Sequence, residues 1–189
     1  MSAPAALPRT HPFPHATSRE FLSPALLEAA LAWMESEAPW KIRIASFYEQ
    51  WELHLSPDIL SDSVQGLLAP DTISGIRSSL LDPIDAAGAT LLEVTAHKLV
   101  AGQTIRIHND FLDGRETHRV LFQLNRGWQD EQGGLLMLFG SASPEDVCRI
   151  VRPTHGSAFS FEISPRSFHA VSTIAGGERF TLVYSFASA

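Results

Sequence analysis

Short β-rich runs recur along the second half of the chain, and they constrain its fold more than any other feature. From residue 89 onward, such runs follow one another at short intervals, separated by Gly, Asp, Asn and Pro. The eight runs cover residues 90–99, 103–108, 118–124, 134–139, 147–152, 157–163, 167–173 and 179–186. Strands at this spacing, with no helical period between them, are typical of a double-sheet jelly roll or barrel.

The first forty residues have a different texture. Residues 1–17 hold four prolines and are expected to form an irregular arm. Ser23 and Pro24 match a helix cap followed by proline at the first helical position. Apolar residues then recur at helical spacing, which predicts an amphipathic helix over 24–37.

The stretch that follows mixes strand and helix patterns. Apolar and polar residues alternate over 40–47, which predicts a strand. Two helical patches are expected around 57–67 and 70–82, the second with Asp71 as a candidate N-cap. The fold class is therefore expected to be α+β and mainly β, with N-terminal helices packed against a jelly-roll core.

The length of 189 residues suits one domain. We expect a single domain over 18–189 after the arm, with helical support over 18–88 and the jelly-roll core over 89–189. The net charge of −7, without a Lys/Arg run, argues against a nucleic-acid partner. One cysteine excludes an internal disulfide and fits a reducing, cytoplasmic compartment. Residues 1–14 do not match a signal peptide, and no apolar run approaches the ~20 residues of a membrane span.

A metal site is predicted where the strand over 103–108 ends. His108 and Asp110 lie two residues apart, so on a strand both side chains would face one point while Asn109 faces away. His169, near the end of the chain, is the candidate third ligand. Two imidazoles and one carboxylate on one face of an octahedron leave three positions open, which suits non-heme Fe(II).

An arginine on the last predicted strand extends this site. Arg179 follows His169 after a Gly-Gly turn, so antiparallel pairing would place it near His169 and deeper in the barrel. Its neighbours are apolar on both faces of the strand, which indicates a central, buried strand. A buried arginine needs a carboxylate, which its planar fork matches bidentately. Thr181, on the same strand face, offers a hydroxyl.

A run of motifs over residues ~95–187 resembles the prolyl-hydroxylase-like branch of the Fe(II)/2-oxoglutarate dioxygenases. That branch has HxD, a strand ending in Leu-Asn, a following Trp, a Gly-Gly-x-Leu strand, a second His and a final strand with Arg or Lys. The matching segments here are 108–110 (HND), 118–125 (HRVLFQLN), 127–128 (GW), 133–139 (GGLLMLF), 167–171 (SFHAV) and 178–182 (ERFTL).

The resemblance implies a double-stranded β-helix in which His108, Asp110 and His169 hold Fe(II). It also implies that Arg179 binds the distal carboxylate of 2-oxoglutarate, while the keto and proximal carboxylate oxygens chelate the iron. The reaction would use O₂, release succinate and CO₂, and hydroxylate an unactivated C–H bond. Because Asp110 fills the carboxylate position, the chain differs from related halogenases.

The chain departs from the family at positions that often carry tyrosines contacting the oxoacid. These positions are expected to be Gln123 and Lys98, and the amide of Gln123 can still donate a hydrogen bond. Two further arginines are candidate substrate residues. By the period of two, Arg106 would face inward with His108, to bind a substrate carboxylate or pair with an acid such as Glu162. Arg119 occupies a position where the family often has an arginine, with a structural or a substrate role.

The substrate is expected to be an amino acid, a peptide, a protein side chain or another small molecule. Two rival functions stay open at this point. One is a cupin-type dioxygenase that uses no oxoacid, although such sites usually cluster more histidines on one strand. The other is a non-catalytic jelly-roll binding module, although all four residues of the expected site are present.

Overall fold

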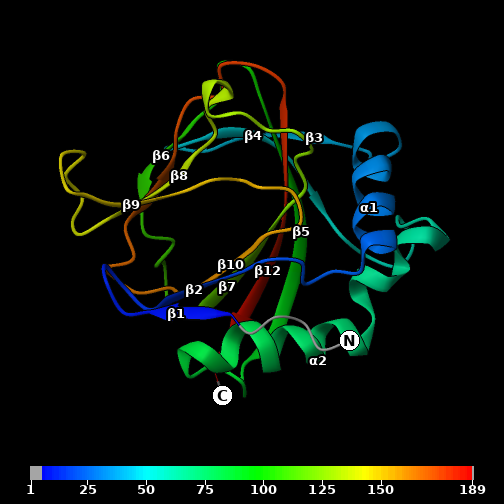
Figure 1. The fold of residues 1–189 in the computed structure, drawn as a ribbon, viewed down its shortest axis with the longest axis horizontal. Coiled ribbons are helices and arrows are strands. Elements are labelled where there is room, and N and C mark those ends of the chain that lie inside the picture. Colours follow the sequence, from blue (N-terminus) through cyan, green and yellow to red (C-terminus); the bar gives the residue numbers. More distant parts are fainter. Residues whose placement is uncertain (1–5, 189) are drawn as a thin grey trace.

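Two antiparallel sheets form the body of the protein, as the sequence predicts (Figure 1). The computed structural model describes residues 6–188. The large sheet, in spatial order, consists of β1 (Leu7–Arg9), β2 (His15–Ser18), β10 (Ala158–Glu162), β7 (His118–Gln123), β12 (Glu178–Ala187), β5 (Thr90–Val100), β4 (Glu49–His54) and β3 (Lys41–Ile44). The small sheet consists of β6 (Ile105–His108), β11 (His169–Val171), β8 (Leu136–Phe139) and β9 (Val147–Val151).

Helical segments lie mainly before β5. They are α1 (Pro24–Ser36), the 3₁₀ helix η1 (Asp62–Leu68), α2 (Pro70–Ile76), the π-helical turn η2 (Arg77–Leu81) and the 3₁₀ turn η3 (Asp82–Ile84), with η4 (Asp130–Gln132) before β8. Ser23 caps α1 as predicted, because its side chain accepts a hydrogen bond from the Leu26 amide at 3.3 Å. No helix of the described residues is long and apolar enough to cross a bilayer.

Strand β12 shows how the alternation of side chains separates two cores. Phe180, Leu182, Tyr184 and Phe186 point to the outer face of the large sheet, where they join apolar residues of the helical segments in one cluster. The other face of the sheet looks toward the small sheet. There, buried side chains including Leu99, Leu138 and Phe161 form a second cluster between the sheets. Arg179, Thr181 and Val183 alternate with the first set and therefore face this interior.

Several sequence expectations for the first half are wrong in detail. Residues 7–9 and 15–18 of the expected irregular arm form β1 and β2, and β2 pairs with β10. Proline is tolerated in β1 because this strand is the outermost of the sheet. The part of the arm before residue 6 lies outside the described residues.

The helical support over 18–88 also contains two strands. The run expected as one strand over 40–47 is β3 and its turn, and β4 follows as an unexpected strand paired with β5. The expected helix over 57–67 is the 3₁₀ helix η1, and that over 70–82 is divided among α2, η2 and η3. Ala69, rather than Asp71, is the N-cap of α2, because Pro70 takes the first helical position.

Candidate metal centre

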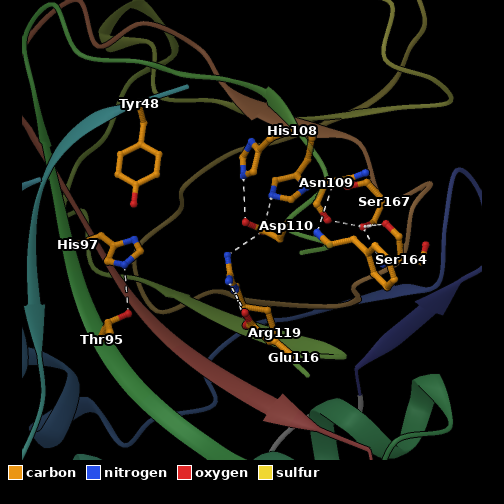
Figure 2. Close-up of polar contacts among 12 residues, drawn as sticks. Tyr48, Thr95, His97, His108, Asn109, Asp110, Glu116, Arg119, Ser164 and Ser167 are labelled. Carbon is orange, nitrogen blue, oxygen red and sulfur yellow. Dashed lines mark hydrogen bonds and ion pairs between the residues drawn. The ribbon is translucent and has the colours of Figure 1, made fainter. Parts of the chain in front are cut away.

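Three side chains meet at one point on the inner face of the small sheet, as predicted. His108 ends β6, His169 begins β11, and the two residues are direct partners in the antiparallel register. Asp110 follows two residues after His108. One ligand atom from each of the three lies within 4.8 Å of the others, and the side chains converge in Figure 2.

Backbone carbonyls fix which nitrogen of each imidazole faces this point. Nδ1 of His108 lies 2.8 Å from the Arg106 carbonyl, and Nδ1 of His169 lies 2.7 Å from the Ser167 carbonyl. Because a carbonyl only accepts, both Nδ1 atoms carry the proton and both Nε2 atoms present a lone pair. These Nε2 atoms lie 3.3 and 3.1 Å from oxygens of Asp110. Three electron-rich atoms facing one another require a cation, so this donor set fits a divalent metal.

A bulge in β6 sets the direction of the His108 side chain. His169 pairs with His108, but Val171 pairs with Ile105, so β6 holds one extra residue over this interval. Ile105 and His108 both face the interior despite being three residues apart. The prediction that Arg106 shares the face of His108 is therefore wrong. Arg106 is exposed, and its guanidinium donates to the Ser46 carbonyl.

Asp110 is held in an unusual conformation. Its φ of 59° lies in the left-handed region, which costs about 1–3 kcal/mol for a residue other than glycine. Burial would raise the pKa of the Asp110 carboxyl, but the positive charge of the neighbouring Arg119 guanidinium holds that pKa well below its usual range. Nη1 of Arg119 donates to Oδ2 of Asp110 at 2.7 Å. The carboxylate is thus charged and ready to bind a cation.

Asn109 faces away from the metal point and anchors the ligand segment. Its side-chain amide donates to the Pro165 carbonyl at 3.2 Å, and its backbone carbonyl accepts from Oγ of Ser167 at 2.8 Å. Ser167 in turn stabilises the turn at 164–167 that precedes His169 (Figure 2). The two ligand-bearing segments are therefore tied together independently of any metal.

Arg179 is a buried cation that forms no ion pair with a carboxylate of the described residues. Its side chain is 4% exposed, and its Nε has no hydrogen-bond partner within the described residues. Burial lowers its pKa to about 10. Leu99 is its register partner on β5 and belongs to the cluster between the sheets, so Arg179 faces the same interior as the metal ligands. The geometry of a guanidinium allows an arginine so placed to hold a carboxylate through two parallel hydrogen bonds.

Hydrogen bonds link Thr181 and Gln123 to Arg179, and their contact with an oxoacid stays a prediction. Nη1 of Arg179 donates to Oγ1 of Thr181 at 2.8 Å, and that hydroxyl donates to Oε1 of Gln123 at 3.2 Å. Thr181 and Gln123 are also register partners on β12 and β7. The three residues form one polar row on the inner face of the large sheet.

Lys98 does not belong to this row, and its predicted contact with an oxoacid is wrong. Its register partner is Phe180, which points to the outer face of the sheet. Nζ of Lys98 lies 3.3 Å from Glu178 and 5.5 Å from the ring centroids of Trp40 and Trp51. The prediction was one residue off along β5, because His97 rather than Lys98 pairs with Thr181. A shift of one residue reverses the face of a strand.

His97 is the residue of β5 that faces the site, and it is not among the site residues predicted from the sequence. It pairs with Thr181 on one side and Glu52 on the other. Burial lowers its pKa to about 3, so the ring is neutral. Its Nδ1 lies 3.3 Å from the Gln50 amide nitrogen. No local signal identifies it, because the face of His97 follows from the register of β5 with β12, a strand that is distant in the sequence.

The strand β4, missed from the sequence, adds further groups on the same side. The Tyr48 hydroxyl and the Gln50 amide both donate to Oε1 of Glu52, at 3.3 and 2.9 Å. Phe47 stacks on the His108 ring with centroids 4.4 Å apart. Figure 2 shows Tyr48 and His97 to the left of His108 and Asp110. The strand predicted over 40–47 stops before β4, and no pattern in 48–54 distinguished these residues from an ordinary loop.

Comparisons with known proteins agree with this site. The sequence profile of the 2OG-Fe(II) oxygenase superfamily matches residues 94–186, which include all three ligands and Arg179. A prolyl 3-hydroxylase, OGFOD1 from Xenopus laevis, is 34% identical over 74 residues, which are 38% of this chain and only 14% of that protein.

Solved structures share the fold along nearly the whole chain. A prolyl-4-hydroxylase from Pseudomonas putida has a TM-score of 0.72 at 23% identity, over 93% of this chain and 92% of that one. A prolyl hydroxylase from Trichoplax adhaerens, solved with a peptide fragment of hypoxia-inducible factor, has a TM-score of 0.69 at 13% identity, over 92% of this chain and 83% of that one.

Proposed function

Because the chain belongs to the 2OG-Fe(II) oxygenase superfamily, on its prolyl-hydroxylase-like branch, we propose that it is a hydroxylase that consumes 2-oxoglutarate and O₂ and releases succinate and CO₂. Its substrate is an amino-acid residue of a peptide or protein, with proline as the first candidate. The free amino acid is the alternative form of the substrate.

One observation carries this proposal: a buried arginine, with no acid partner in the described part of the chain, faces the same interior as a His-Asp-His triad. The triad alone would suit several metal-dependent oxygenases. A buried guanidinium beside it requires an anionic ligand, and a five-carbon oxoacid is such an anion with a second chelating end. The cupin alternative explains neither Arg179 nor the row formed by Thr181 and Gln123.

The chain's own residues position the reactants. His108, Asp110 and His169 would hold Fe(II), which would supply the coupling of oxoacid decarboxylation to O₂ activation. Arg179 and Thr181 would hold the far carboxylate of the oxoacid, fixing its orientation toward the triad. Phe47 covers one face of the His108 ring and limits access of water on that side.

A peptide or protein substrate is supported by the surface beside the site. A groove of about 500 Å³ runs between the β3–β4 turn and the β5–β6 turn, and Phe47 and Tyr48 belong to its lining. An extended chain in this groove would pass the ring that stacks on His108. The hydroxyl of Tyr48, which belongs to this lining, can hydrogen-bond a substrate backbone there. The related enzymes named above, from Xenopus laevis, Pseudomonas putida and Trichoplax adhaerens, are prolyl hydroxylases.

The test is succinate release from anaerobically Fe(II)-loaded protein after O₂ is admitted, with and without 2-oxoglutarate and pools of proline-containing peptides. We expect succinate only with the oxoacid, more of it with an accepted peptide, and a peptide that gains one oxygen atom from ¹⁸O₂. Substrate oxidation without the oxoacid would favour the cupin-type alternative. No oxoacid-dependent turnover with any peptide or amino-acid pool would favour a binding module.

A further inference from the structure

All three guanidinium nitrogens of Arg119 donate hydrogen bonds to two carboxylates beside the metal point. Nη1 donates to Oδ2 of Asp110 at 2.7 Å. Nε and Nη2 donate to the two oxygens of Glu116, at 2.8 and 2.6 Å, in the forked geometry of a bidentate pair. The side chain is 20% exposed, and Figure 2 shows it directly beneath Asp110. A substrate carboxylate would have to displace one of these partners, so a substrate role does not fit Arg119.

The Asp110 side chain needs a hydrogen-bond donor such as Arg119 to fix its orientation, because the surrounding backbone constrains it little. Its φ is left-handed, and it opens a loop in which Leu112 is 92% exposed. Asn109 and Ser167 tie down the residue before it. Among the described residues, the only hydrogen bond to the carboxylate that would persist with a metal bound comes from Arg119, because the two imidazole nitrogens then face the metal.

We infer that Arg119 is a positioning residue that occupies one oxygen of Asp110 and leaves the other oxygen for the metal, with Glu116 holding Arg119 in place. Arg119 reaches Asp110 from the inner face of β7, where its register partners are Ser185 and Phe161. Arg119 and Glu116 together are called the clamp below. The clamp connects Asp110, which follows β6 of the small sheet, to the centre of the large sheet.

Charge balance explains why the clamp contains a second acid. Arg119 alone would neutralise Asp110 and weaken its attraction for a divalent cation. With Glu116, the trio of two carboxylates and one guanidinium keeps a net charge of −1. Glu116 thus allows the arginine to orient the ligand without cancelling its charge. Partners of this kind around metal ligands typically change metal affinity by about 10- to 100-fold when removed.

The inference is tested with Co(II), which reports binding by calorimetry and ligand geometry by its visible absorption and needs no substrate. We expect Arg119→Gln to weaken Co(II) binding by about 10- to 100-fold and to change the Co(II) spectrum. Arg119→Lys, which keeps the charge but loses the fork, should recover part of the affinity. Glu116→Gln should weaken binding by several-fold (about 3- to 10-fold) with a smaller spectral change.

Arg126→Gln is the matched control, because it breaks another arginine–carboxylate pair, with Glu28, on the exposed surface. It should leave both the affinity and the spectrum of Co(II) unchanged. Circular dichroism identifies any variant that fails to fold, in which case Glu116→Gln carries the test.

The inference is wrong if folded Arg119→Gln binds Co(II) as tightly as the parent protein with the same spectrum, or more tightly. The proposed hydroxylation is judged separately, because a substrate that is never found leaves these metal affinities and spectra measurable. A parent protein that binds no Co(II) would instead overturn the metal centre itself.

Discussion

Arg179 has a hydroxyl, a glycine and apolar groups for neighbours, and among the described residues no carboxylate is paired with it. Its guanidinium therefore keeps a charge that only a ligand can balance. The metal ligands are similar in character, because their lone pairs and negative charge converge without a cation from the protein at their centre. At the residue scale, the site therefore combines a positive charge at Arg179, which fits an anion, with the electron-rich triad, which fits a cation.

Changing Arg179 should separate oxoacid binding from metal binding. We expect Arg179→Lys to weaken 2-oxoglutarate binding by about 10- to 100-fold, because the forked hydrogen bonds to a carboxylate are lost while the charge remains. Calorimetry with Mn(II) in place of iron measures the effect, and Mn(II) affinity alone should not change. Arg152→Lys, at an exposed pair with Asp130, serves as the control. Equal oxoacid affinity in parent and Arg179→Lys would mean that another residue binds that carboxylate.

His97 should make folding stability depend on pH. Burial lowers its pKa to about 3 from 6.5, so the unfolded chain takes up a proton that the folded chain resists. The stability from neutral His97 is therefore fully present above about pH 6.5 and is lost as the pH falls toward 3. Its contribution to the slope is at most about 1.4 kcal/mol per pH unit.

Urea unfolding with a chelator present, at several values between about pH 7 and 4, measures this slope. His97→Asn should give a flatter dependence than the parent protein. His15 and His118 also have lowered pKa values and stay in both proteins, so only the difference is assigned to His97. Parallel curves for the two proteins would show that His97 is protonated as easily in the folded state as in the unfolded one.

At the scale of the elements, two local irregularities place the functional groups. The bulge in β6 directs His108 inward and Arg106 outward. The Gly-Gly turn before β8 lets the backbone pass close to Arg179. At Gly134, φ is +66°, and an added Cβ would lie 2.8 Å from Cδ of Arg179 and 2.8 Å from Ile174.

Gly134→Ala should therefore disturb the oxoacid site, whereas Gly102→Ala should not. Both glycines have positive φ, but an added Cβ at Gly102 meets nothing within 4 Å. Both variants should lose roughly 1 kcal/mol or more of unfolding free energy from backbone strain. Only Gly134→Ala should also weaken 2-oxoglutarate binding, by roughly tenfold (about 1.4 kcal/mol) if Arg179 is displaced. If both variants bind the oxoacid equally well, the close packing at Gly134 has no functional role.

At the scale of the whole molecule, the sequence predicted the two-sheet core because short β-rich runs separated by turn residues mark the strands of the second half. It also predicted the triad, Arg179, Thr181 and Gln123, because each follows from a local motif or from a regular strand. It failed where position depends on tertiary pairing. The side of Arg106 depends on a bulge, and the displacement from His97 to Lys98 depends on register across β5. The strands β2 and β4 contain polar and small residues, and their pairing with distant strands cannot be predicted from their own sequences.

The central claim is that the triad and Arg179 act as one site, in which a metal and an oxoacid bind together. Its most direct test is titration of 2-oxoglutarate into the protein with and without Mn(II), by calorimetry under argon at one pH. We predict that the metal tightens oxoacid binding at least tenfold (about 1.4 kcal/mol), because one end of the oxoacid chelates the metal while Arg179 holds the other. Equal affinity with and without Mn(II) would contradict the account.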